Sequence, residues 1–107
     1  METVAKFRLA FEERNSGGVL WKRPPAEWVL KNFDGCNTHT VDSLIHQHLV
    51  DCGEIDQVTE TREDYRHLDQ YHYDFRISIL GRRIYVETVL GESSMGPVVT
   101  VVSVHPA

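Results

Sequence analysis

Apolar and polar residues repeat with two different periods along this chain, and the period changes at Gly53. Before Gly53, apolar residues recur at the spacing of a helix that buries one face. After it, apolar and polar residues alternate, as they do in a strand whose two faces differ. The pattern therefore predicts a helical layer over residues 1–53 and a sheet layer over residues 54–107.

Two or three helices are predicted in the first layer. The first would cover residues 2–14, and the glycine pair at 17–18 would end it. The second would begin at Pro24 and Pro25, because proline suits the first turn of a helix, and would end before residues 34–35. We therefore expect both helices to contribute an apolar face to the core.

The third predicted helix has the clearest boundaries. Thr40 is expected to cap its first turn and Gly53 to end it. The apolar stripe between them comprises Val41, Leu44, Ile45, His48, Leu49 and Cys52.

The second layer predicts an antiparallel meander. Residues 54–61 alternate weakly and suit an edge strand, residues 62–70 form a polar loop or a loose helical turn, and residues 71–80 alternate strictly. Gly81-Arg82 is expected to form a two-residue hairpin turn. Counting from this turn gives cross-strand pairs of Ile79 with Ile84, Ile77 with Val86, Phe75 with Thr88, Tyr73 with Leu90, Ser78 with Tyr85 and Arg76 with Glu87.

A loop over residues 91–97 then leads to a valine-rich last strand over residues 98–105, whose composition predicts a central position. The predicted fold is α+β, with two or three N-terminal helices packed on one face of a three- or four-stranded antiparallel meander. That packing leaves the opposite sheet face open. We expect any function to lie on this open face.

Length and composition fit one domain and exclude several classes. The chain has 107 residues, of which 41% are hydrophobic and 25% charged, so it can form a core without disulfides or an obligatory metal. No apolar run approaches the roughly 20 residues of a membrane span, and the N-terminus lacks the basic start and apolar middle of a secretory signal. We therefore expect a cytoplasmic protein with no membrane partner.

The net charge of −5 is concentrated in residues 54–74, which hold seven acids and two arginines. The rest of the chain balances to zero. A nucleic-acid-binding protein is usually basic, whereas the pI here is about 5.6. Any RNA-binding role would therefore depend on a local patch of the sheet.

The open face carries residues suited to RNA cleavage by 2′-hydroxyl attack, which needs a base, an acid and a cation but no metal. Glu87 or His105 would act as base or acid, and Tyr85 as an acid or a stacking platform. Arg76 and Arg83 would hold phosphate. The alternative interpretation is that Arg76 and Glu87 form a solvated cross-strand ion pair.

The last two thirds of the chain, ending in YHYDFRISILGRRIYVETVLGESSMGPVVTVVSVH, resemble in pattern the small toxin-type endoribonucleases of the barnase, colicin and RelE fold group. In that group, cleavage residues lie on the sheet face away from the helices. The resemblance implies such roles for Arg76, Arg83, Tyr85, Glu87 and His105. The acidic pI departs from the group, whose members tend to be basic.

Two alternatives remain open from the sequence. Cys36-x2-His39 and His48-x3-Cys52 have the residue types of a tetrahedral zinc site, although cysteine is also a common core residue. The chain would otherwise be a non-enzymatic interaction module, with the acidic segment 54–74 meeting a protein partner or the last strand pairing into a homodimer. No nucleotide-binding or other cofactor motif occurs, so no cofactor is predicted.

Overall fold

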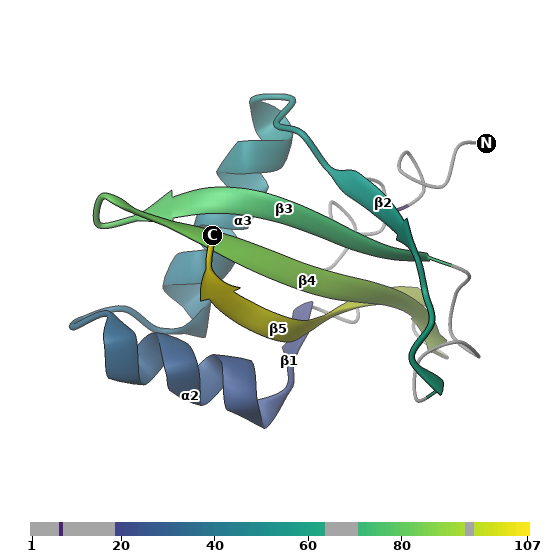
Figure 1. Ribbon diagram of the computed structural model, residues 1–107, viewed down its shortest axis with the longest axis horizontal. Helices are drawn as coiled ribbons and strands as arrows, with labels where there is room; N and C mark the ends of the chain where they lie inside the picture. Colours follow the sequence, from purple (N-terminus) through teal and green to yellow (C-terminus); the bar gives the residue numbers. More distant parts are fainter. Residues whose placement is uncertain (1–6, 8–18, 64–70, 94–95) are drawn as a thin grey trace.

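The structure is a computed structural model that describes residue 7 and residues 19–63, 71–93 and 96–107 (Figure 1). Within these residues lie two helices, α2 (Arg23–Asn32) and α3 (Thr38–Val50). The strands are β1 (Val19–Trp21), β2 (Asp56–Thr59), β3 (Tyr71–Ile79), β4 (Arg82–Ser93) and β5 (Gly96–Pro106). None of the helices in this part of the chain is long and apolar enough to cross a membrane.

The five strands form one mixed sheet in the order β1-β5-β4-β3-β2. Strands β2 to β5 form the predicted antiparallel meander, with β2 at the edge as expected. The prediction of a purely antiparallel sheet with three or four strands was wrong, because β1 joins it parallel to β5. Three residues are too few to reveal a period of two, so the sequence pattern missed β1 and assigned it to the helical layer.

Strand β5 lies inside the sheet, as its valine content predicted, between β1 and β4. Val99, Thr100 and Val101 pair with β1 on one side and with β4 on the other. The proposed homodimer required β5 to be an edge strand, and this condition is not met along the segment that β1 covers.

The core lies between the helices and one sheet face. Helix α3 crosses behind the sheet, and α2 lies beside β5 (Figure 1). The predicted first helix, residues 2–14, lies outside the described residues apart from Phe7, whose ring is buried and stacks on Tyr73 with 5.0 Å between centroids. The other core residues of the helices are Val29, Phe33, Val41, Ile45 and Leu49.

Both ends of α3 differ from the prediction. Asn37 is the N-cap, and Thr40 is its partner in a capping box rather than the cap itself.

At the C-terminal end of α3, Cys52 has a left-handed φ of 57° and its N–H donates to Leu49 O, while the Gly53 N–H donates to His48 O. This is a Schellman motif, a turn that usually has glycine where Cys52 lies. Cys52 is therefore exposed and does not belong to the apolar stripe.

The hairpin between β3 and β4 turns one residue earlier than predicted. Leu80 and Gly81 have positive φ values of 50° and 79°, which is the pattern of a type I′ turn, so Ile79 lies opposite Arg82. Every predicted cross-strand pair is consequently displaced by two residues. Because a strand repeats every two residues, the predicted inner and outer faces were nevertheless right.

The predicted loops lie only partly within the described residues. Of the loop over 62–70, residues 64–70 lie outside them. The loop over 91–97 is shorter than predicted, because β4 extends to Ser93 and β5 begins at Gly96.

Candidate functional site

Two adjacent rows of side chains cross the outer face of the sheet, the face away from α3. The first, here called the cation–aromatic row, consists of three residues on β3, β4 and β5 that lie opposite one another: Arg76, Tyr85 and His105. The second, the acidic row, continues onto β2 and comprises Asp56, Asp74, Glu87 and Ser103. Side chains opposite one another on a sheet face lie within contact distance, so each row is a continuous surface.

A bulge in β5 decides which residues join these rows. Thr88 lies opposite Val101, whereas Glu87 lies opposite Ser103, so Val102 is an extra residue. Without this insertion, Val104 would lie opposite Tyr85. The bulge keeps Val101 in the core and brings His105 into the cation–aromatic row.

The three side chains of the cation–aromatic row pack together around the tyrosine. The guanidinium carbon of Arg76 lies 5.1 Å from the centroid of the Tyr85 ring. The His105 ring stacks on Tyr85 with 5.1 Å between centroids and 23° between planes. His105 Nδ1 is 3.1 Å from Pro106 O, and because a carbonyl only accepts, Nδ1 is the donor. Nε2 of His105 is therefore the ring nitrogen that this bond leaves unoccupied.

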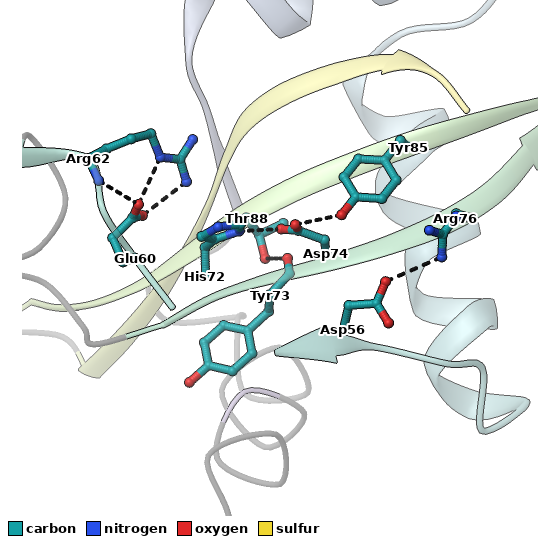
Figure 2. Close-up of polar contacts among 9 residues, drawn as sticks. All are labelled: Asp56, Glu60, Arg62, His72, Tyr73, Asp74, Arg76, Tyr85 and Thr88. Atoms are coloured by element: carbon teal, nitrogen blue, oxygen red, sulfur yellow. Dashed lines mark hydrogen bonds and ion pairs between the residues drawn. The ribbon is translucent and has the colours of Figure 1, made fainter. Parts of the chain in front are cut away.

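Asp74 is the buried centre of the acidic row. Only 1% of its side chain is exposed, yet both of its oxygens accept a hydrogen bond: Oδ1 from His72 Nδ1 at 2.7 Å and Oδ2 from Tyr85 Oη at 2.7 Å (Figure 2). Burial raises the pKa of Asp74 above its usual value, and the nearby charge of Glu87 adds to this. The bonds from His72 and Tyr85 oppose this shift without reversing it.

Tyr85 is held as a neutral phenol. Burial raises its pKa, and the hydrogen bond and charge of Asp74 raise it further. A phenol that already donates its proton to Asp74 is a poor acid for a second partner. Of the two predicted roles, the geometry favours the platform, because the ring positions Arg76 and His105.

Glu87 differs from the other carboxylates of the acidic row. It lies directly opposite Asp74 and is half-buried. Asp56 forms an ion pair with Arg76 at 3.3 Å, and Asp74 accepts two hydrogen bonds. No hydrogen bond or ion pair, by contrast, joins the carboxylate of Glu87 to another described residue. Like charges placed opposite each other destabilise a sheet, so this row costs folding free energy.

A second buried carboxylate, that of Glu60, is paired with an arginine beside the acidic row (Figure 2). The side chain of Glu60 is 1% exposed and accepts hydrogen bonds from the backbone N–H, Nε and Nη2 of Arg62, the last two at 2.9 Å (Figure 2). Burial alone would raise the pKa of Glu60, but the hydrogen bonds and charge of Arg62 lower it below its usual value. Three acids of the 54–74 segment, Asp56, Glu60 and Asp74, are thus occupied within the protein, which leaves fewer of them for an acidic docking surface.

The structure brings most of the predicted site residues together. Arg76, Tyr85 and His105 form one row, and Glu87 lies in the next. Arg83 lies opposite Ser78, outside both rows but diagonal to Arg76, and lines a pocket beside α3. The predicted ion pair between Arg76 and Glu87 was wrong, because the hairpin register places Tyr85 opposite Arg76 and the arginine pairs with Asp56.

Sequence reasoning missed the role of Asp74, although a signal was present. Asp74 alternates with Tyr73 and Phe75, so it shares the outer face with His72 and Arg76. Aspartate is depleted in strands, so one between two aromatic residues in the middle of a strand indicates a specific partner. The second missed residue, Asp56, required the register of β2, which its weak alternation does not reveal.

The four residues of the predicted zinc site do not gather. Within the described ranges, the group of His, Cys, Asp or Glu residues close enough to share a metal is instead His72, Asp74 and Glu87, whose ligand atoms all lie within 4.8 Å of one another. Among the zinc candidates Cys36 is buried, Cys52 and His39 are exposed, and His48 Nε2 donates to Glu54 O at 2.8 Å. A cation at Asp74 would have to displace the bonds from His72 and Tyr85, so the geometry fits a hydrogen-bonded cluster better than a metal centre.

No family model, curated protein or solved structure matches this chain. The two rows of side chains are therefore the features of this protein that bear on its function.

Proposed function

We propose that this protein cleaves RNA without a metal, through the outer face of its sheet. The observation that carries the proposal is the Glu87 carboxylate, which has no partner among the described residues and lies in the row next to Arg76, Tyr85 and His105. A base, a proton donor and a cation are the groups that 2′-hydroxyl attack on a phosphodiester needs. The tightly packed ring of Tyr85 keeps the cation and the imidazole in place.

Each residue has one role in the proposed reaction. Glu87 takes the proton of the 2′-hydroxyl as its oxygen bonds to phosphorus. The bond from phosphorus to the 5′-oxygen breaks, and Nε2 of a protonated His105 gives a proton to that oxygen. The products are a 2′,3′-cyclic phosphate and a 5′-hydroxyl. Arg76, with most of its five N–H groups unused, stabilises the charge on the phosphoryl oxygens.

Tyr85 and Asp74 act as positioning residues. Asp74 accepts a hydrogen bond from the Tyr85 hydroxyl and so fixes the ring, whose faces contact Arg76 and His105. The cost of placing Glu87 opposite Asp74 supports a functional origin for the pair, because a sheet selected for stability alone would avoid it.

The test is cleavage of an unstructured RNA in EDTA, with detection of the 2′,3′-cyclic phosphate by mass spectrometry. Glu87→Gln and His105→Gln should each lower the rate about 100-fold or more, the contribution typical of a positioned acid or base. The matched controls Glu54→Gln and His46→Gln change exposed residues outside the rows and should leave the rate unchanged. DNA of the same sequence should be inert, because it lacks the 2′-hydroxyl.

A stability measurement separates catalysis from unfolding. Because Glu87→Gln removes the repulsion with Asp74, it should raise the free energy of unfolding at neutral pH by about 0.5 kcal/mol. Folded wild-type protein that leaves every RNA intact, or cleavage that EDTA abolishes, would refute the proposal.

A further inference from the structure

A pocket opens beside the site, at the edge of β3 that β2 leaves uncovered. Strand β2 pairs only with Tyr71–Asp74, so within the described residues the rest of β3 has no strand on that side. The pocket has a volume of about 290 Å³ and lies between this edge and α3. Its lining residues are Leu44, Gln47, His48, Arg76, Ile77, Ser78 and Arg83.

The charge of this lining is unusual for the chain. Two of the lining residues are arginines and none is acidic, although the whole chain has a net charge of −5. Arg83 is exposed, and no hydrogen bond or ion pair joins its guanidinium to any other described residue. The neighbouring Arg82, by contrast, donates to Asn32 O at 3.1 Å and lies over the Phe33 ring. Arg83 is thus an arginine with its full hydrogen-bonding capacity available beside a pocket.

Three further polar side chains line the pocket, and Gln47 Nε2 already donates to Asp51 Oδ1 at 2.9 Å. His48 is fixed by its bond to Glu54 O and by stacking on Phe75 with 5.6 Å between centroids. Gln47 and Ser78 add an amide and a hydroxyl. Arginine donors around a concave surface suit a phosphoryl group, whose oxygens accept paired hydrogen bonds.

Arg76 connects this pocket to the site already described. It lines the pocket and also lies over the Tyr85 ring. Because Arg76 lies opposite Tyr85 and Arg83 opposite Ser78, the two arginines are diagonal neighbours on the outer face, about 7–8 Å apart at the backbone. One nucleic-acid strand can therefore reach both arginines with consecutive phosphates.

We propose that this pocket is a phosphate-binding subsite, in which Arg83 holds the phosphate next to the one that is cleaved. The RNA part of this inference rests on the proposed function. Phosphate binding itself does not, so the two can fail separately.

The first experiment titrates the wild-type protein with inorganic phosphate at constant ionic strength and follows the arginine Nε–H signals by NMR. The Arg83 signal should shift and saturate. Arg83→Gln should weaken phosphate binding about tenfold, the effect of losing a charge-assisted hydrogen bond. The matched control Arg82→Gln removes the same charge one residue away and should leave the affinity within about twofold. Shifts that chloride reproduces, or equal losses in the two variants, would overturn the subsite.

The second experiment distinguishes RNA from free phosphate as the ligand. A 2′-O-methyl RNA oligonucleotide cannot be cleaved, because its 2′-oxygen carries no proton. It should move the same Arg83 signal and compete with inorganic phosphate. If phosphate binds at Arg83 and the oligonucleotide leaves this signal unchanged, the site takes a free phosphate and its RNA assignment is wrong. If the oligonucleotide binds there but wild-type protein cleaves no RNA, the subsite stands and the proposed cleavage fails.

Discussion

The β3–β4 turn offers a direct test of the register that places Arg76 beside Tyr85. Leu80 occupies the first central position of this turn with φ of 50°. This left-handed conformation costs most residues about 1–2 kcal/mol, whereas Gly, Asn and Asp adopt it more readily. Its side chain is 71% exposed, so replacing it removes little buried surface. Asn is the preferred residue before Gly in a type I′ turn. Leu80→Asn should therefore stabilise the protein.

The expected gain follows from these numbers. Relief of the left-handed strain is worth about 1 kcal/mol, and the loss of an exposed leucine costs almost nothing. A change of this size should raise the midpoint of thermal unfolding by about 4 °C in a domain of this length. Circular dichroism during heating and urea unfolding would both measure the change.

Leu80→Ala is the matched control, because it also removes the leucine but suits the left-handed conformation no better. It should stay within about 0.5 kcal/mol of the wild type. The alternative register, with its turn at Gly81-Arg82, would make Leu80 an ordinary strand residue, and Asn would then destabilise it by about 0.5 kcal/mol. A lower stability for Leu80→Asn than for Leu80→Ala would refute the observed turn and, with it, the arrangement of the two rows.

Two further predictions concern the buried acid and the end of α3. Because burial raises the pKa of Asp74 above 3.8, its contribution to stability is greatest below pH 3.8 and falls as the pH rises through the raised folded pKa. Asp74→Asn should therefore gain stability relative to the wild type as the pH rises above 3.8, and urea unfolding that shows the opposite slope would contradict this. Cys52→Gly should raise the free energy of unfolding by about 1 kcal/mol, since Cys52 occupies the left-handed position of a Schellman motif; an unchanged thermal midpoint would argue against that motif.

Much of the fold could be predicted because periodicity reports which face of an element is buried. The alternation over residues 71–80 gave β3 its observed start and came within one residue of its observed end, and Pro24 and Pro25 marked the start of α2. Periodicity could not show that residues 19–21 pair with β5, since a strand so short has no period. It also could not place the turn at Leu80-Gly81, because the Asn or Gly that usually marks the first position of such a turn is absent here.

The candidate site was harder to predict for an electrostatic reason. Counting from the expected turn at Gly81-Arg82 placed Arg76 opposite Glu87, and the opposite charges of that pair gave no reason to doubt the register. The structure instead places Asp74 opposite Glu87 and gives Arg76 to Tyr85. Two carboxylates opposite each other lower the stability of a sheet, so a prediction based on stability avoids this pairing. Functional sites are where proteins most often break such rules. A register that appears unfavourable by charge alone is therefore a reason to look for function at Glu87.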